Sequence, residues 1–294
     1  MNERRVAVTG AGGQLGVQVV HAFEAAGWQA LALTRSQLDI SDPVQLGKVR
    51  AWRPAVVVNC AAWTDVDACA RDPERAMAIN GTAAGLVAEA AADVRALAVQ
   101  ISTNEVFDGA RNEPYGEADE PAPINAYGAS KLTGERLVAA SNPRHLIIRT
   151  AWIFGPGGRN FPSKILSVAR EKAALGESVR VVADEIGNPT WAPDLAQGIL
   201  ASVTAELSGR LAPGALHVAG MPAVSRFEWA RLVLGETPHV NLVPVTIADY
   251  PRPSRVPPRA VLATERASTL GIRPSNWRTA TVGYIRDLTT LPVA

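Results

Sequence analysis

Residues 5–16 read RVAVTGAGGQLG, and this stretch decides the class of fold. A short apolar run leads into a turn with Gly10, Gly13 and Gly16, and an apolar-periodic helix follows to about Ala26. A strand, a glycine turn and a helix can cradle a pyrophosphate, because glycines allow close approach and the helix N-terminus supplies free N–H groups. We predict a dinucleotide site here; the alternative is a glycine-rich turn without a ligand.

Apolar strands and helical segments alternate through the first half of the chain. This alternation indicates an α/β fold with a parallel, doubly wound sheet of the Rossmann type. Further strands are expected at 30–34, 55–59, 96–102 and 145–149, and helices at 72–92, at 126–140 and from Pro43, where proline suits the first helical position. Ligands of such sheets bind beyond the carboxyl ends of the strands.

The pattern loosens after residue 152, which suggests a second, smaller unit. Helices are expected there at 161–175, 193–207 and 226–234, and strands at 178–183 and 215–218. We assign residues 1–150, with about 185–220, to a nucleotide-binding domain. Residues 151–184 and 221–294 would then form a smaller C-terminal lobe for the substrate.

The residue after the second predicted strand bears on the choice of cofactor. A domain that binds NAD usually carries Asp or Glu there to hold the ribose 2′-hydroxyl, whereas this chain has Arg35. Arginine suits a 2′-phosphate through forked, charge-assisted hydrogen bonds. We therefore expect NADPH; the alternative is an exposed surface arginine.

A tyrosine and a lysine begin the helix expected at 126–140. Tyr127 and Lys131 are four residues apart, so they lie on one helix face and can act on one small volume. A nearby ammonium favours the phenolate, so the pair can exchange protons near neutral pH. The alternative is a half-buried tyrosine beside a solvated lysine. Chemistry is favoured because the glycine turn and Ser102-Thr103 reach the same edge of the sheet.

Composition excludes several classes of protein. The 294 residues carry a formal net charge of +1 and a pI near 7.8, which gives no electrostatic case for nucleic acid or an anionic membrane. The N-terminus lacks the apolar region of a signal peptide, and no apolar run is long enough to span a membrane. Two cysteines, Cys60 and Cys69, and four histidines form no evident metal-ligand cluster. We expect a cytoplasmic protein without a metal.

Several stretches together resemble the extended short-chain dehydrogenase/reductases, and among them the dTDP-4-dehydrorhamnose reductases. The matching pieces are TGAGGQLG (9–16), NCAAWTDVD (59–67), AIN (78–80), ST (102–103), VFDG (106–109), YGASKLTGE (127–135), RTAWIFG (149–155) and GNPT (187–190). The resemblance implies hydride transfer from NADPH to the 4-keto group of a dTDP-4-keto-6-deoxyhexose. The product would be dTDP-L-rhamnose or a related deoxysugar nucleotide.

The resemblance also implies roles for individual residues. Tyr127 would donate a proton to the C4 oxygen, and Thr103 would hydrogen-bond the same oxygen. Lys131 would lower the pKa of Tyr127 and hold the nicotinamide ribose. Such donors act most strongly where negative charge builds in the transition state. The residues expected to contact the cofactor are Gly10, Gly12, Gly13, Gln14, Leu15, Arg35, Asp39, Ile40, Cys60, Ala61, Ala62, Thr64, Ser102, Tyr127 and Lys131.

A smaller set is expected to contact the substrate. It comprises Thr103, Asn104, Glu105, Tyr127, Trp152 and Arg252. Trp152 would pack on the sugar; the alternative is a core tryptophan. Arg252 would hold a phosphate; the alternative is a solvated arginine.

Two positions in the expected sugar pocket depart from the family pattern. The family usually has Asp-Tyr after the catalytic threonine, where this chain has Asn104-Glu105. The sugar-nucleotide 4,6-dehydratases carry Thr-Asp-Glu there and need an acid and a base to eliminate water. An asparagine cannot donate a proton as a carboxylic acid does, which argues against dehydration. A 4-ketoreductase of antibiotic sugar synthesis with a different product fits the change equally well.

Two other departures concern the nucleotide and the assembly. The family signature Arg-Pro-x-x-Ser-x-Leu is blurred, because RP (252–253) is followed by SRVPP (254–258). Some relatives dimerise through a metal held by glutamates, at positions where this chain has Gln18 and Pro193. We therefore expect no structural metal, and a monomer or a dimer that no metal mediates.

Two further classes of function remain as alternatives. An NAD-retaining epimerase or dehydratase would keep its cofactor through purification, whereas a reductase exchanges it at every turnover. A regulatory subunit that only binds NADP would have no need of a proton donor. The presence of Thr103, Tyr127 and Lys131 speaks against that second class.

Overall fold

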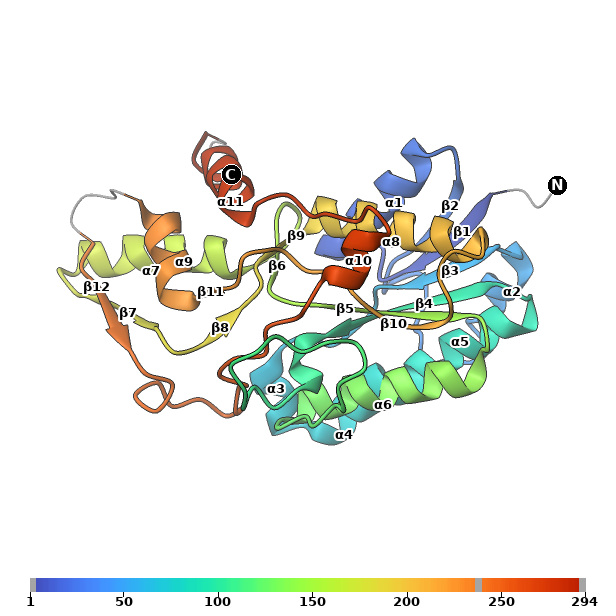
Figure 1. Cartoon of the computed structure of the whole chain (residues 1–294), viewed down its shortest axis with the longest axis horizontal. Coiled ribbons are helices and arrows are strands. Elements are labelled where there is room, and N and C mark those ends of the chain that lie inside the picture. The colour runs from blue at the N-terminus through green and yellow to red at the C-terminus, as the bar shows by residue number, and fades with distance from the viewer. Residues whose placement is uncertain (1–3, 236–239, 291–294) are drawn as a thin grey trace.

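The computed structural model describes residues 4–235 and 240–290, and its centre is a six-stranded sheet (Figure 1). The strands lie in the order β10-β5-β4-β3-β1-β2, and neighbouring strands are parallel. Their bounds are β1 (Arg5–Thr9), β2 (Gln29–Leu33), β3 (Val56–Asn59), β4 (Leu97–Thr103), β5 (His145–Thr150) and β10 (Gly214–His217). The predicted doubly wound parallel sheet is confirmed.

Helices cover both faces of the sheet, so alternate strand residues enter two different cores. Val6 packs with α1 and α8 on one face, whereas Ala7 packs with α2, α5 and α6 on the other. Figure 1 shows α1 and α8 on the opposite side of the sheet from α5 and α6. The bounds are α1 (Gln14–Ala25), α2 (Gly47–Trp52), α5 (Ala83–Asp93), α6 (Ala126–Ser141) and α8 (Ala192–Leu207).

The prediction that a helix begins at Pro43 is wrong, because α2 begins at Gly47. The segment before it forms turns, and the carboxylate of Asp42 accepts a hydrogen bond from the Val44 N–H at 2.9 Å. A local side-chain bond of this kind offers the backbone an alternative to the helix.

The single helix predicted at 72–92 is interrupted. Three segments occupy that range, namely α4 (Pro73–Ala76), a π-helical turn η1 (Met77–Thr82) and α5. A further helix, α3 (Val66–Arg71), was not predicted and precedes them. Asp72 caps α4 by accepting a hydrogen bond from the Arg75 N–H at 3.0 Å. The π turn packs directly on α6, because a Cβ on Gly134 would lie 2.2 Å from the Asn80 carbonyl oxygen.

A smaller lobe lies at the end of the molecule away from β2 (Figure 1). Its apolar core contains Phe154, Trp229, Trp277 and Tyr284. Its helices and strands are β6 (Ile153–Phe154), α7 (Phe161–Ala174), β7 (Val179–Val182), β8 (Ile186–Gly187), β9 (Thr190–Trp191), β11 (Val224–Ser225), α9 (Arg226–Leu234), β12 (Leu242–Val245) and α11 (Trp277–Thr290).

The predicted division of the chain between domain and lobe stays a prediction. Helix α8 and strand β10, from the assigned 185–220 segment, pack on the sheet and pair with it. Helix α10 (Glu265–Thr269) falls in the segment assigned to the lobe, yet Ala267 and Ile272 lie in the core formed by α1 and α8. The chain therefore returns to the sheet before it forms α11.

Candidate active site

The turn between β1 and α1 has no room for side chains at two of its glycines. Gly10 has a φ of +65°, and a Cβ there would lie 2.6 Å from the backbone nitrogen of Ala61. A Cβ on Gly16 would lie 2.2 Å from the Gly10 carbonyl oxygen. The glycines therefore bring the start of α1 against the ends of β1 and β3, where a ligand can reach the helix N-terminus.

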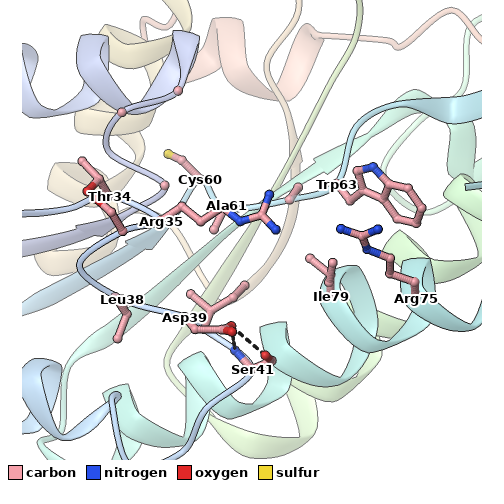
Figure 2. A pocket seen from close by; sticks show the side chains of 16 residues that line it. Thr34, Arg35, Leu38, Asp39, Ser41, Cys60, Ala61, Trp63, Arg75 and Ile79 are labelled. Carbon is pink, nitrogen blue, oxygen red and sulfur yellow. Dashed lines mark hydrogen bonds between the residues drawn. The ribbon is translucent and has the colours of Figure 1, made fainter. Parts of the chain in front are cut away.

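A cavity of about 830 Å³ opens beside this turn, at the carboxyl ends of β1, β2 and β3 (Figure 2). We call it the first cavity. The predicted cofactor residues that line it are Gly10, Gly12, Gly13, Arg35, Asp39, Ile40, Cys60, Ala61 and Ala62. The lining residues that were not predicted are Thr34, Ser36, Leu38, Ser41, Trp63, Arg75 and Ile79.

Two arginines extend into the first cavity from different elements, Arg35 after β2 and Arg75 from α4 (Figure 2). The Arg75 guanidinium lies 4.7 Å from the ring centroid of Trp63. The Asp39 carboxylate accepts hydrogen bonds from the Ser41 hydroxyl at 2.6 Å and N–H at 2.9 Å, and these bonds hold the pKa of Asp39 below its usual value. The cavity thus offers guanidinium groups to a phosphate and a fixed carboxylate to a hydroxyl.

A second cavity, of about 400 Å³, adjoins the first at the ends of β4 and β5. We call it the central cavity. It shares Gly13, Cys60 and Ala62 with the first cavity. The other predicted residues that line it are Gln14, Leu15, Thr64, Ser102, Thr103, Asn104, Glu105, Tyr127, Lys131 and Trp152.

Helix α6 places Tyr127 and Lys131 in the central cavity, and both side chains are buried. Asn125 caps the helix, because its Oδ1 accepts a hydrogen bond from the Gly128 N–H at 2.7 Å. The Lys131 ammonium donates to the carbonyl oxygen of Ile101 at 2.6 Å. The predicted pair is therefore held on one helix face at the end of β4.

Burial changes the acidity of both groups. It raises the pKa of Tyr127 above its usual 10.0; Glu105 raises it further, and a hydrogen bond with Thr103 opposes the increase. Burial also lowers the pKa of Lys131 to about 8, although Glu135 favours its charged form. The pKa of Tyr127 is therefore raised overall, because desolvation of the phenolate dominates, and the predicted lowering by Lys131 stays a prediction.

An ion pair supports this pair of residues from the interior. The Arg149 guanidinium of β5 donates to Glu135 of α6 at 2.7 Å, and the two side chains are only 6% and 7% exposed. The hydroxyl of Ser102 donates to the same carboxylate. Ser102, predicted to contact the cofactor, is thus fixed at the end of β4 by the Glu135 carboxylate.

A third cavity, of about 520 Å³, lies against the lobe. We call it the lobe cavity. It shares Thr64, Trp152, Ile153, Arg159 and Arg226 with the central cavity. Its basic and aromatic side chains are Arg159, Lys164, Arg180, Arg226, Arg252, Trp152, Phe161, Trp229 and Tyr250.

Trp152 stands where the central and lobe cavities meet. Its φ of +45° is unusual for a bulky residue. The guanidinium of Arg226 lies 3.5 Å from its ring centroid and donates to Glu185 at 3.1 Å. A Cβ on Gly187 would lie 2.5 Å from the ring, so glycine is required behind it. Trp152 packs against the lobe core and also lines both cavities. It is therefore neither a fully buried core tryptophan nor a freely exposed one.

Arg252 joins the lobe to the sheet domain. Its Nε donates to Asp67 of α3 at 3.0 Å, and the same carboxylate oxygen accepts from the Ser254 N–H at 3.1 Å. Arg252 also lines the lobe cavity. One of its five donors is taken by the protein, and the others can meet a ligand.

The structure brings every predicted site residue to the wall of one of the three cavities, and the role of each residue stays a prediction. Sequence reasoning missed Arg75, Arg159 and Arg226, and also Glu185. Arg226 and Glu185 meet because β11 pairs with β8, with Ser225 opposite Ile186. No local sequence pattern signals that pairing.

Two kinds of feature are absent from the described ranges, 4–235 and 240–290. No group of three or more His, Cys, Asp or Glu side chains there could hold a metal ion. Among the helices of those ranges, none combines the length and apolar character needed to cross a bilayer.

Fold and site together define a class of protein. A glycine turn and an arginine-lined cavity at the ends of β1 to β3 adjoin a buried tyrosine, lysine and threonine at the end of β4. This is the arrangement of a nicotinamide-dependent carbonyl enzyme, an extended short-chain dehydrogenase/reductase.

Within that class, the chain belongs to the RmlD substrate binding domain family, which it matches over residues 4–290. It is 36% identical to the dTDP-4-dehydrorhamnose reductase of Burkholderia thailandensis, over 97% of this chain and 99% of the relative. It is 39% identical to that of Mycobacterium tuberculosis, over 94% of this chain and 90% of the relative. The resemblance predicted from the motifs is confirmed.

A solved structure supports the same membership. The dTDP-4-dehydrorhamnose reductase of Bacillus anthracis, determined in complex with NADP, is 32% identical and has a TM-score of 0.87. The match covers 97% of this chain and 99% of that structure.

Proposed function

We propose that this protein uses NADPH to reduce the 4-keto group of a dTDP-4-keto-6-deoxyhexose, giving dTDP-L-rhamnose or a related deoxysugar nucleotide. Membership of the reductase family supports the reaction, and the NADP complex of the Bacillus anthracis relative supports the cofactor.

The order of the three cavities carries this proposal. The central cavity shares Gly13 and Ala62 with the first cavity, and Trp152 and Arg226 with the lobe cavity. A dinucleotide that binds at the glycine turn would therefore reach the central cavity with its nicotinamide. A sugar nucleotide held in the lobe cavity would reach the same place with its sugar. The hydride donor and the ketone would meet beside the tyrosine and lysine of α6.

Different residues of the central cavity have different roles in ketone reduction. When bound, NADPH supplies the hydride. The Tyr127 hydroxyl donates a proton to the keto oxygen as negative charge builds there, and the Thr103 hydroxyl hydrogen-bonds the same oxygen. The raised pKa of Tyr127 keeps its proton in place until that charge develops. Lys131 holds the ribose and, as an ammonium, favours the tyrosinate that results.

The first cavity suits the adenosine end of NADPH. Arg35 would bind the 2′-phosphate, the group that distinguishes NADPH from NADH, and Arg75, which lines the same cavity, could offer a second guanidinium. Asp39 and Ile40 would lie at the adenine and its ribose.

The lobe cavity suits a nucleoside diphosphate. Its basic side chains can bind two phosphates, and its aromatic rings can stack on a pyrimidine. The set comprises Arg159, Lys164, Arg180, Arg226, Arg252, Trp152, Phe161 and Tyr250.

A 4-ketoreductase with a different sugar product is the second candidate, and the residues after Thr103 favour it. Asn104 donates from Nδ2 to the Ala260 carbonyl oxygen at 2.9 Å, so this amide joins the sheet domain to the C-terminal segment. The amide cannot serve as the acid of a dehydratase. Glu105 replaces the tyrosine usual in the family and changes the shape and charge of the sugar pocket.

Location and assembly belong to the same proposal. Cys60 and Cys69 are both free thiols, which suits the reducing cytoplasm. Gln18 and Pro193 stand where some relatives have metal-binding glutamates. We therefore infer a cytoplasmic monomer, or a dimer without a bridging metal.

The test follows NADPH oxidation by the purified protein with dTDP-4-keto-6-deoxyglucose, with and without a 3,5-epimerase, and identifies the product by NMR. Turnover that requires the epimerase supports dTDP-L-rhamnose as the product. Turnover without it supports the second candidate. No oxidation in either mixture, or a nicotinamide that stays bound through purification, would refute a reductase.

A further inference from the structure

One acidic side chain in the central cavity has no part in the proposed reduction. Glu105 lies in a 3₁₀ turn, η2 (Asn104–Val106), directly after Thr103. Reduction uses the hydroxyls of Tyr127 and Thr103 and needs no carboxylate. A half-buried carboxyl beside them is a candidate for a second proton transfer.

The carboxyl of Glu105 is held in a fixed position. Nδ2 of Asn125 donates to its Oε2 at 2.7 Å, and the Glu105 N–H donates to the Thr103 hydroxyl oxygen at 3.2 Å. A Cβ on Gly128 would lie 2.0 Å from the Glu105 carbonyl oxygen, so α6 packs directly on this turn. Glu105 and Tyr127 line the same central cavity, and the Glu105 carboxylate raises the pKa of Tyr127 electrostatically.

The surroundings of Glu105 make it a base of suitable strength. Burial raises its pKa to about 7, the hydrogen bond from Asn125 lowers it, Glu185 raises it, and Arg252 and Arg226 lower it. A carboxyl with a pKa near neutrality can both accept and return a proton under ordinary conditions.

Both arginines that face Glu105 are bonded to other carboxylates. Arg226 donates to Glu185 at 3.1 Å, and Arg252 donates to Asp67 at 3.0 Å. Glu105 therefore keeps the basicity that a direct ion pair with either arginine would remove.

A ketone has acidic C–H bonds at the carbons next to the carbonyl, because the enolate carries its charge on the oxygen. Those carbons are one bond from the keto carbon, whose oxygen Tyr127 and Thr103 would hold. We propose that Glu105 removes a proton from one of these α-carbons, so that the protein catalyses enolisation of its keto sugar in addition to reduction. The identity of the ketone rests on the proposed function.

The step balances without a co-reactant. The carboxylate forms an O–H bond with the α-proton, and the C–H electron pair becomes the C=C bond of the enol. The carbonyl π electrons take the proton of Tyr127. In reverse, Glu105 returns a proton to the same face of the carbon, and the tyrosinate recovers its own. In deuterated water Glu105 exchanges its proton with solvent, so the sugar gains deuterium without inversion.

The test incubates the full chain with dTDP-4-keto-6-deoxyglucose in deuterated buffer, with NADP⁺ present and no hydride donor. Mass spectrometry and proton NMR measure deuterium at the α-carbons. We expect exchange well above the buffer rate, and a loss on the order of 100-fold or more, limited by that rate, in Glu105→Gln. Glu113→Gln, which removes an exposed carboxylate from the following loop, is the matched control and should exchange like wild type.

A second variant protects the test against misfolding. Glu105→Ala should regain exchange when formate is added, because a small carboxylate can occupy the space left by the side chain. NADPH binding, followed by fluorescence, shows that each variant is folded. If Glu105→Gln does not bind NADPH, the formate experiment decides, and failure of formate to restore exchange counts against the inference.

Reduction measured in parallel, with NADPH in place of NADP⁺ and both with and without the 3,5-epimerase, separates the two proposals. Wild type that reduces the ketone but exchanges only at the buffer rate overturns enolisation alone, as does Glu105→Gln that exchanges like wild type. Wild type that exchanges but reduces the ketone neither with nor without the epimerase overturns the reductase proposal and supports enolisation. Absence of both activities overturns both.

Discussion

The ammonium of Lys131 lies 2.6 Å from the carbonyl oxygen of Ile101, so the helix that carries the tyrosine is bonded to the strand that carries the threonine. A carbonyl oxygen orients the ammonium but does not neutralise it. Lys131 therefore remains a desolvated cation whose pKa falls to about 8. The bond from Lys131 to Ile101 fixes α6 against β4, but burying the ammonium lowers the stability of the folded protein.

Lys131→Met should be inactive, yet more stable than wild type near neutral pH, by about 1–3 kcal/mol. The folded pKa of about 8 lies below the unfolded value of 10.5, so the unfolded chain binds more protons between those values. Wild type therefore gains stability as pH rises through that window, and the advantage of the variant should shrink. Urea unfolding at both ends of the window measures this; a constant difference would contradict it.

Tyr127→Phe should lower kcat for ketone reduction by about 10²–10⁴-fold, because the proton donor is lost and the ring remains. NADPH binding should change little, since the phenyl ring still fills its place between α6 and the cavity. Stopped-flow reduction and a fluorescence titration measure the two effects. Turnover near the wild-type rate would show that another group donates the proton.

Arg35→Ala should weaken NADPH binding by about 10- to 100-fold and NADH binding far less, because only NADPH carries the 2′-phosphate. Arg136→Ala, which removes an exposed arginine from α6, is the matched control and should leave both affinities unchanged. Equal weakening of both cofactors would remove Arg35 from the 2′-phosphate.

Glu135→Gln should destabilise the protein by about 3–5 kcal/mol, because it leaves the Arg149 guanidinium buried without its carboxylate. Removing both charges, with Glu135→Leu and Arg149→Met, should cost much less. The more exposed pair of Arg50 and Asp93, whose side chains are 33% and 49% exposed, is the control, and Asp93→Asn should cost less than about 1 kcal/mol. Chemical denaturation of the four proteins decides; similar costs for the buried and exposed pairs would contradict the expectation.

The α-carbon exchange proposed for Glu105 should accelerate as pH rises toward and past about 7, because only the deprotonated carboxylate accepts the proton. Reduction in the same range should not follow that profile, since its donor is the Tyr127 hydroxyl. Parallel pH profiles of deuterium uptake and NADPH oxidation measure the difference. Identical profiles would indicate that one group controls both reactions.

Local sequence signals predicted the sheet and most of the cofactor side. A few consecutive residues were enough to predict the glycine turn at Gly10 and Gly16, and likewise the continuous apolar strand β3. Arg35 was equally visible, because its place after β2 follows from the alternation of strands and helices. Each of these features has a signature in the local sequence, although Gly10 also meets the distant Ala61.

Features that depend on distant contacts were missed. The π turn at Met77–Thr82 accompanies the approach of Gly134 to the Asn80 carbonyl, a contact between separate helices. The Arg226–Glu185 pair beside Trp152 depends on two short strands that no periodicity reveals. The low basicity of Lys131 likewise follows from burial, which a four-residue motif does not report.

The amide of Asn125 serves three parts of the chain at once. Its oxygen accepts from Gly128, and its nitrogen donates to Glu105 at 2.7 Å and to the Arg255 carbonyl oxygen at 2.9 Å. All its N–H donors are therefore in use. A chimera that exchanges the C-terminal segment with that of a relative must keep the backbone path that brings the carbonyl oxygen of residue 255 to Asn125. Without it, a transplant meant to alter nucleotide choice would also loosen the first turn of the catalytic helix.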